Sequence, residues 1–348
     1  MKKEENIRLG ISIGDLNGIG AEVVLRIFED NRMLDFCTPI IFASIKTMSF
    51  VKNHFKLDIN LNGIHNINQA IAGRVNVLNC WKENVNINFG QEDLKIGEFA
   101  IKSLVQATKA LKEDEIDVLV TAPINKHNIQ SDTFKFPGHT DYLNQELEGN
   151  SLMFMVTQGL RVGLLTDHVP VKDIAAHITP KLIEEKIATV YQSLVQDFRI
   201  NKPKIAVLGI NPHTGDNGVI GNEDDTVLRP TLQKIKATGK LVFGPYAADS
   251  FFGSDNYKNF DAIIASYHDQ GLIPFKTLSF GQGVNYTAGL NRVRTSPDHG
   301  TAYEIAGKGT ADISSFKEAI FTGIQIFKNR KEYQELTKNP LGFSKRKI

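Results

Sequence analysis

The stretch Ser266-Tyr-His-Asp-Gln-Gly-Leu-Ile-Pro-Phe-Lys276 follows directly on the apolar run Phe260-Asp-Ala-Ile-Ile-Ala265. That run has the length and composition of a short buried strand. In an open α/β sheet, ligands bind outside the carboxyl ends of the strands. Side chains suited to metals or anions gather just beyond this strand: His268, Asp269, Lys276, Asn285, Arg294, Asp298 and His299. The sequence therefore predicts an active-site floor here, and the alternative is a polar surface loop.

Strands and helices alternate along the chain. Apolar runs predict strands at residues 9–13, 39–42, 74–78, 117–121, 152–157, 163–166, 204–209, 241–243 and 260–265. Helical periodicity predicts helices at residues 21–29, 96–112, 227–236 and 315–328, and one that Thr179 caps and Pro180 opens. The turn between residues 157 and 163 predicts one antiparallel pair. The alternation elsewhere predicts an α/β fold with a mostly parallel sheet.

Composition narrows the classes of protein. A chain of 348 residues suggests two domains or one large one, and a net charge of +1 gives no electrostatic case for nucleic acid or an acidic membrane surface. Two cysteines, Cys37 and Cys80, are too few for a disulfide framework. Residues 1–5 lead into a strand-like segment without the apolar region of a signal peptide, and no apolar run is long enough to span a bilayer. We therefore expect a cytoplasmic protein.

Three predicted strands end in a histidine: His168, His213 and His268. Strand ends of one sheet can converge although they are far apart in sequence. Three neutral imidazoles with an open position suit Zn²⁺ or a similar divalent ion. Neighbouring carboxylates are suited to orient the rings or complete the metal shell: Asp167, Asp249 and Asp269. The alternative for each histidine is a hydrogen-bonded loop residue, because no short metal-ligand motif is present.

Other polar segments suit anions. Lys276 and Arg294, together with His139 and Thr140, would suit phosphate and carboxylate groups, since arginine supplies a bidentate fork and lysine a point charge. Lys276 is also a candidate for proton transfer. The loop at residues 298–309 is a candidate for holding a nucleotide. The loop at residues 14–20 is either an anion-binding turn or only a tight turn, and it matches neither G-x-G-x-x-G nor a P-loop.

Taken together, these segments resemble the 4-hydroxythreonine-4-phosphate dehydrogenase family of pyridoxal-phosphate biosynthesis from about residue 8 to 327. The resemblance rests on Gly14-Asp-x-x-Gly-Ile-Gly20, Thr121-Ala-Pro-Ile-Asn-Lys126, Pro137-Gly-His-Thr-Asp141, Thr166-Asp-His-Val-Pro170, Asn211-Pro-His-x-Gly215, Gly244-Pro-x-x-x-Asp249, His268-Asp-Gln-Gly271, Gly283-Val-Asn285 and Arg294-Thr-Ser-x-Asp-His-Gly-Thr-Ala302. The usual Gly-Asp-Pro-x-Gly and Pro-His-Ala-Gly-Glu are Gly14-Asp-Leu-Asn-Gly18 and Pro212-His-Thr-Gly-Asp216 here. These departures leave the choice of substrate slightly open.

The resemblance implies a homodimer of two-lobed α/β/α subunits that share their active sites. The implied fold is that of the isocitrate and isopropylmalate dehydrogenases and not the Rossmann fold. By that analogy, one lobe comprises residues 1–130 and 275–348 and the other residues 131–274. The implied metal ligands are His168, His213 and His268, and the ion is Zn, Mg or Co. The implied substrate-binding residues are His139, Thr140, Lys276, Asn285 and Arg294.

The implied reaction is oxidation of 4-phosphooxy-L-threonine by NAD or NADP. It gives a β-keto acid that loses carbon dioxide to form 3-amino-2-oxopropyl phosphate. The expected cofactor residues are His299, Gly300, Thr301 and Gly307, and the general base is Lys276, Asp249 or a metal-bound water. The nearest alternative keeps the chemistry and takes D-threonate or D-erythronate 4-phosphate. The others are a metal-dependent phosphatase and a non-catalytic metal-binding protein.

Overall fold

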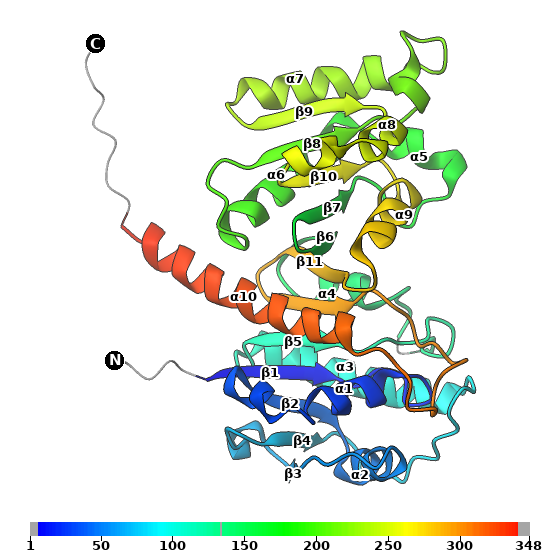
Figure 1. Ribbon diagram of the computed structural model, residues 1–348, viewed down its shortest axis with the longest axis vertical. Coiled ribbons are helices and arrows are strands. Elements are labelled where there is room, and N and C mark those ends of the chain that lie inside the picture. Colours follow the sequence, from blue (N-terminus) through cyan, green and yellow to red (C-terminus); the bar gives the residue numbers. More distant parts are fainter. Residues whose placement is uncertain (1–5, 133, 340–348) are drawn as a thin grey trace.

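The structure is a computed structural model that describes residues 6–132 and 134–339, and its centre is one twelve-stranded mixed sheet (Figure 1). The strand order is β3-β4-β2-β1-β5-β12-β11-β6-β7-β10-β8-β9. The strands are β1 (Ile7–Ser12), β2 (Cys37–Ala43), β3 (Leu61–Ile64), β4 (Val75–Asn79), β5 (Val118–Thr121), β6 (Gly149–Thr157), β7 (Leu160–Leu164), β8 (Lys204–Leu208), β9 (Leu241–Tyr246), β10 (Ala262–Ala265), β11 (Val284–Leu290) and β12 (Val293–Pro297).

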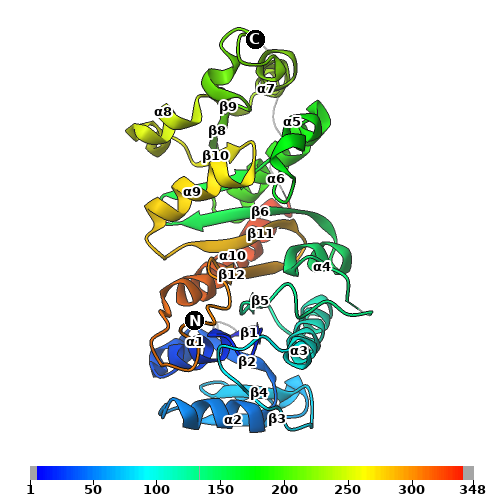
Figure 2. The ribbon, with the colours of Figure 1, turned by 90° about the vertical axis from the view of Figure 1, so that its right-hand side faces the viewer.

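Two parallel halves meet at the middle of this sheet. The strands from β3 to β12 pair in parallel, and so do those from β7 to β9. Between the halves, β6 and β11 run antiparallel to their neighbours, which include the predicted β6–β7 pair. The molecule is elongated, with one half of the sheet toward each end (Figure 2). We call the middle of the sheet, where β6, β11 and β12 join the halves, the waist. The predicted α/β class is confirmed, and the division at residues 130 and 275 stays a prediction.

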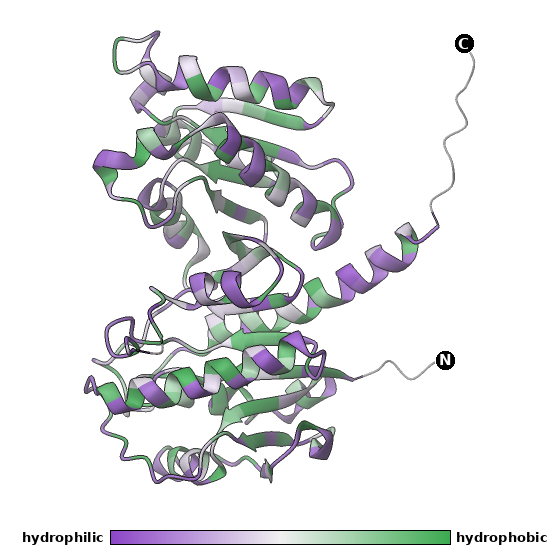
Figure 3. Ribbon diagram, turned by 180° about the vertical axis from the view of Figure 1, so that it is seen from behind, coloured by the Kyte–Doolittle hydropathy of each residue, from purple (hydrophilic) through white to green (hydrophobic). Residues whose placement is uncertain are grey.

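Helices cover both faces of the sheet. They are α1 (Gly20–Ile27), α2 (Ile45–His54), α3 (Leu94–Lys112), α4 (His139–Glu146), α5 (Ile174–His177), α6 (Pro180–Gln196), α7 (Arg229–Ala237), α8 (Ala248–Gly253), α9 (His268–Ser279) and α10 (Ser314–Thr337). Alternate residues of β5 belong to different cores: Val118 and Val120 share one with Phe316 of α10, whereas Leu119 shares another with Leu104 of α3. Side chains alternate across a strand, so β5 is buried on both faces. Figure 3 shows these apolar strands in green between the helical layers.

Local sequence explains α6 well. The Thr179 hydroxyl accepts a hydrogen bond from the Leu182 amide at 3.2 Å, and Pro180 occupies the first turn, where it loses no helical hydrogen bond. The apolar side chains on one face of this helix are fully buried: Ile183, Ile187, Val190 and Leu194. The sequence therefore sets both the start and the inward face of α6.

The elements that were not predicted include α9, β11 and β12. Residues 268–279 form α9, which has Pro274 in its interior and no side-chain cap at Tyr267. The polar segment behind it contains β11 and β12, which carry Asn285 and Arg294 into the middle of the sheet. Tertiary pairing produces these strands, because polar residues give them no clear alternation.

A buried polar network attaches the end of the chain to the waist. The Arg330 guanidinium of α10 donates to the Asp197 carboxylate at 2.6 Å and to the Tyr286 hydroxyl at 2.6 Å. Tyr286 in turn donates to Asp197 at 2.6 Å, and Ser193 does the same. Every charge in this network is paired, so it serves as a structural clamp.

Within residues 6–132 and 134–339, no helix combines the length and the apolarity that a membrane span requires. The expectation about the N-terminus concerns residues 1–5, which lie outside the described part.

Candidate active site

A pocket of about 260 Å³ opens at the waist, where the two halves of the sheet meet. The ends of β5 and β12, the middle of β6 and the first residues of α4 and α9 form its walls. It combines predicted metal, substrate and cofactor residues: His139, Thr140, His168, His268, Lys276, Asn285, Arg294, His299 and Gly300. The carboxyl end of β5 reaches this pocket, as the general rule for α/β sheets leads one to expect.

Arg294 is the dominant charge of the pocket. It is the second residue of β12, and its side chain is buried, with 2% exposed. Its Nε and Nη2 groups donate to the Thr121 hydroxyl at 3.2 and 2.6 Å, and Nη1 donates to the Thr287 hydroxyl at 3.0 Å. No carboxylate of the described residues lies within 4.0 Å of it, and burial lowers the pKa of Arg294 to about 9. A buried charge of this kind favours an anion as its partner.

Three buried polar atoms around the pocket have no hydrogen-bond partner within the described chain. They are His139 Nε2, Asn285 Oδ1 and His299 Nε2. Burial, assisted by the positive charges of Arg294 and Lys126, holds the pKa of His139 well below its usual 6.5, so the ring is neutral at pH 7. Unsatisfied buried groups are uncommon in folded proteins, and such groups around a pocket point to a bound ligand.

The other anion-binding candidates lie on α4 and α9. His139 and Thr140 open α4, whose N-terminus has no side-chain cap, so its amides favour negative charge. The Lys276 ammonium donates to the Asp298 carbonyl oxygen at 2.8 Å and lies 3.4 Å from the Asp298 carboxylate. This contact joins α9 to the loop that follows β12, across the pocket.

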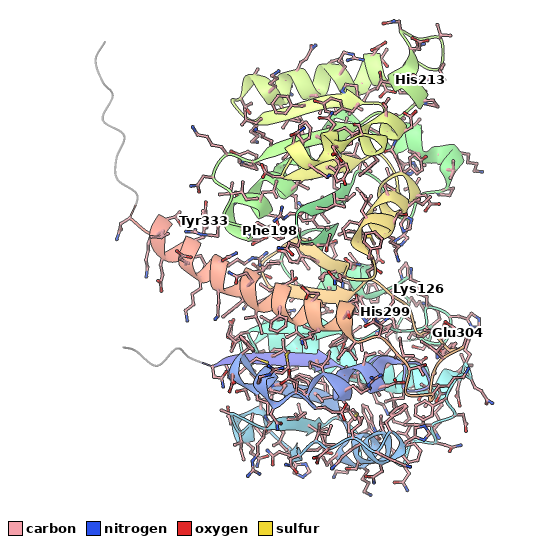
Figure 4. All side chains as sticks on the ribbon, in the orientation of Figure 1. Lys126, Phe198, His213, His299, Glu304 and Tyr333 are labelled. Atoms are coloured by element: carbon pink, nitrogen blue, oxygen red, sulfur yellow. The ribbon has the colours of Figure 1, made fainter. Side chains whose placement is uncertain are left out.

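Two of the three proposed metal ligands come together. The rings of His168 and His268 lie 6.0 Å apart, and the Asp269 carboxylate lies 2.7 Å from His268 Nδ1. A carboxylate in this position orients an imidazole for metal binding through its other nitrogen. His213 lies outside the pocket, at the far end of the second half and well apart from Lys126 and His299 (Figure 4).

No third ligand joins the two histidines within the part of one chain that the structure describes. Among residues 6–132 and 134–339 there is no group of three His, Cys, Asp or Glu side chains that could hold a metal ion. His213 begins a run of six residues with positive φ, from His213 to Gly218, which is rare for residues other than glycine. Strained backbone of this kind is concentrated at functional sites.

The remaining predicted residues also lie outside the pocket. Asp249 is exposed on α8. Thr301 packs on the loop at residues 14–20, where its carbonyl oxygen accepts the Ile19 amide at 3.0 Å. Gly307 has φ +78° and packs on Phe89.

The loop at residues 14–20 is a scaffold. The buried Asp15 carboxylate accepts hydrogen bonds from Asn128 Nδ2 and from the Tyr303 hydroxyl, both at 2.7 Å. These contacts bind the loop to two neighbouring segments, and it does not line the pocket. The structure therefore favours the tight-turn interpretation over an anion-binding turn.

Sequence reasoning missed several pocket residues. Lys126 and Thr121 line the pocket, and Thr287 supports Arg294 from behind. Lys126 closes the quoted segment at residues 121–126, so its position after a predicted strand was the available signal. The two threonines gave none, because a buried hydroxyl in a strand has no sequence signature.

Comparisons with known proteins agree with this site. The family model described as pyridoxal phosphate biosynthetic protein PdxA matches residues 35–323. The chain is 47% identical to the 4-hydroxythreonine-4-phosphate dehydrogenase of Bacteroides thetaiotaomicron, over 97% of this chain and 94% of that protein. It is 34% identical to the D-threonate 4-phosphate dehydrogenase of Cupriavidus necator, over 92% and 98% of the two chains.

Similarity to solved structures supports the same family. The crystal structure of 4-hydroxythreonine-4-phosphate dehydrogenase from Klebsiella pneumoniae matches with a TM-score of 0.80 and 28% identity, over 94% of this chain and 99% of that one. The match covers both halves of the sheet and the pocket between them. On this evidence the chain is a member of the PdxA family of pyridoxal phosphate biosynthetic proteins.

Proposed function

We propose that this protein oxidises 4-phosphooxy-L-threonine with NAD⁺ or NADP⁺ and serves pyridoxal 5′-phosphate biosynthesis. The product is a β-keto acid that loses carbon dioxide to give 3-amino-2-oxopropyl phosphate. Family membership supports the reaction class, since the relative that is 47% identical bears the name of this activity. The observation that carries the proposal is the buried Arg294, which has no carboxylate partner among the described residues and lines a pocket with unsatisfied polar atoms.

The basic side chains would bind the two anionic ends of the substrate. Arg294 provides parallel N–H donors suited to phosphate and carboxylate groups, and Lys276 places a flexible amine beside them. Neutral His139 and Thr140 would complete the hydrogen bonds to the anion, and Asn285 Oδ1 would accept one from an N–H or O–H group of the substrate. His139 Nε2 and Asn285 Oδ1 have no hydrogen-bond partner among the described residues. Binding at both ends would fix the hydroxyl-bearing carbon for hydride transfer.

His168 and His268 would hold one divalent ion, with Zn, Mg or Co as candidates. The two rings and the orienting Asp269 fit a metal site that lacks one ligand. We assign the missing ligand to His213 of a second copy of the chain, so the active enzyme is a homodimer. The ion would lower the pKa of the substrate hydroxyl.

Lys276 is our choice for the group that takes the hydroxyl proton. Of the two candidate side chains, Lys276 lines the pocket of a single chain and Asp249 is exposed on α8. The nucleotide would bind along residues 299–307, of which His299 and Gly300 border the same pocket. We place the reaction in the cytoplasm, where both cysteines remain reduced.

The test follows NADH absorbance with purified protein and 4-phosphooxy-L-threonine. We expect NADH formation that stops with a chelator and returns when a divalent metal is added. D-threonate 4-phosphate is the competing substrate, because the relative from Cupriavidus necator bears its name. A higher kcat/KM for D-threonate 4-phosphate would replace the proposed substrate. Phosphate release without a need for NAD⁺ would exclude a dehydrogenase.

The metal assignment has its own test. Mixing His213→Ala with His268→Ala subunits should restore part of the activity, because each mixed dimer can assemble one complete site. Separately, each variant should be inactive while remaining folded by circular dichroism. Full activity of the His213→Ala variant alone would remove His213 from the site.

A further inference from the structure

The surroundings of Arg294 are chemically unusual. Buried arginines are ordinarily paired with a carboxylate, because an isolated charge is expensive in a medium of low dielectric constant. Here the neighbours of the guanidinium are two fully buried threonine hydroxyls, those of Thr121 and Thr287. The two hydroxyls fix the guanidinium in place, and no carboxylate of the described residues neutralises its charge.

A count of donors shows what remains for a ligand. A guanidinium has five N–H groups. The Thr121 hydroxyl accepts one from Nε and one from Nη2, and the Thr287 hydroxyl accepts one from Nη1. One N–H on each Nη atom is left, and Arg294 lines the pocket. Two terminal N–H groups are the arrangement that binds phosphate or carboxylate with two parallel hydrogen bonds.

The two hydroxyls also come from different strands. Thr121 ends β5, which pairs in parallel with β12, and Thr287 lies in β11, which pairs with β12 on its other side. The guanidinium is thus held from both neighbouring strands of the sheet. Rotation of the side chain would break a bond to one of them, so its orientation is set before any ligand arrives.

We propose that Thr121 and Thr287 are positioning residues that orient the buried Arg294 and leave its charge uncompensated, so that the anionic group of the substrate becomes its counter-ion. This inference rests on the proposed function, in which Arg294 binds the phosphate or carboxylate end. It adds a rule for this site: the partners of Arg294 must accept hydrogen bonds and must not carry charge. A carboxylate at either position would form an ion pair with Arg294 inside the protein, and the anionic ligand would then bind more weakly.

The experiment places that carboxylate in the protein. Thr287→Asp is compared with Thr287→Ser in the intact protein, with inorganic phosphate as the probe. We measure the thermal midpoint in a phosphate-free buffer, its rise with added phosphate, and the phosphate Kd by calorimetry. We expect Thr287→Asp to raise the midpoint without phosphate and to weaken phosphate binding by at least about tenfold. Thr287→Ser should keep the Kd of the parent protein within about threefold.

A positioning role also predicts the kinetics. Thr287→Asp should raise KM for 4-phosphooxy-L-threonine much more than it lowers kcat, and Thr287→Ser should restore both values. Thr121→Val and Thr121→Ser form a second pair that tests the same idea if Thr287→Asp does not fold. We expect the valine variant to raise KM and the serine variant to behave like the parent protein.

Thr295 provides a matched control. It is equally buried, in β12 next to Arg294, but its hydroxyl donates to the Ala319 carbonyl oxygen at 2.7 Å. Thr295→Val should lower the thermal midpoint and leave the phosphate Kd unchanged. If Thr295→Val raises the phosphate Kd as much as Thr121→Val does, the loss of binding comes from a general destabilisation of the sheet. That result would overturn the proposal.

The two proposals fail in different ways. Tight phosphate binding by Thr287→Asp, in a protein that oxidises 4-phosphooxy-L-threonine, would overturn the inference and leave the proposed function intact. Conversely, no NADH formation by the parent protein, together with phosphate binding that Thr287→Asp abolishes, would overturn the substrate assignment alone. An Arg294→Gln variant that binds phosphate as tightly as the parent protein would overturn both roles of Arg294.

Discussion

Replacing Arg294 by methionine should make the ligand-free protein more stable while it removes anion binding. The two side chains are of similar length, and methionine adapts to irregular space in a core. The change deletes a buried positive charge that has no carboxylate partner among the described residues. Replacement of buried charge by apolar groups is often neutral or stabilising, in contrast to removal of one member of an ion pair.

The size of the effect follows from two opposing contributions. Burial lowers the pKa of Arg294 from 12.5 to about 9, which corresponds to a penalty of about 5 kcal/mol at pH 7. The substitution leaves the Thr121 and Thr287 hydroxyls buried without their donor, which costs about 3 kcal/mol for the two together. We therefore expect the variant to gain about 2 kcal/mol. The penalty is fully present below pH 9 and disappears as pH rises toward 12.5, so the gain should shrink in strong alkali.

Urea unfolding at a fixed protein concentration, in a buffer free of phosphate and carboxylates, measures this difference. Added phosphate should stabilise the parent protein and not the variant. Loss of two charge-assisted hydrogen bonds should weaken phosphate binding on the order of a hundredfold. A variant that is less stable than the parent protein by 2 kcal/mol or more, in the absence of phosphate, would refute the view that the charge of Arg294 is uncompensated.

Three further changes test other parts of the chain. His139 is neutral in the folded protein because its pKa is well below 6.5. Below pH 6, the parent protein should therefore lose up to about 1.4 kcal/mol of unfolding free energy per pH unit relative to His139→Gln. Urea unfolding across pH measures this difference. Lys126→Met should raise KM about tenfold with little change in kcat, whereas Lys126→Arg should not, and steady-state kinetics distinguish the two. Arg330→Met leaves the Asp197 carboxylate buried without its cation and should lower the free energy of unfolding by about 3–5 kcal/mol. Arg199→Met removes a more exposed ion pair and should lower it by less than about 1 kcal/mol in the same urea assay. Equal losses for these two arginine variants would contradict the clamp.

Helices and strands that contain apolar runs were predictable from sequence. Strands that form only because neighbouring strands pair with them were not. The run at residues 260–265 became β10 because its side chains are buried whatever lies beside it. By contrast, β12 contains a buried arginine, and its identity as a strand depends on hydrogen bonds to β5 and β11. Helix α9 was hidden by Pro274, which argues locally against a helix interior.

The candidate site shows the same division. Residue types and strand ends indicate an anion and metal site, since His268 and Lys276 follow an obvious strand. Sequence could not show that Arg294 is buried without a counter-ion, because that fact depends on which strands flank it. It also could not identify Thr121 and Thr287, which act only through the arginine between them.

The position of His213 is the clearest case in which one chain does not bring the predicted metal ligands together. Its motif predicts a ligand, its backbone has an unfavourable left-handed conformation, and it nevertheless lies outside the pocket that contains His168 and His268. Six consecutive residues with a left-handed backbone conformation cost free energy, and this conformation persists only where surrounding contacts stabilise it. Contact with a second copy of the chain would supply such a requirement, because the loop would then present His213 to the pocket of its neighbour. The dimer and the metal site would accordingly form together, and chelation should weaken dimerisation as well as activity.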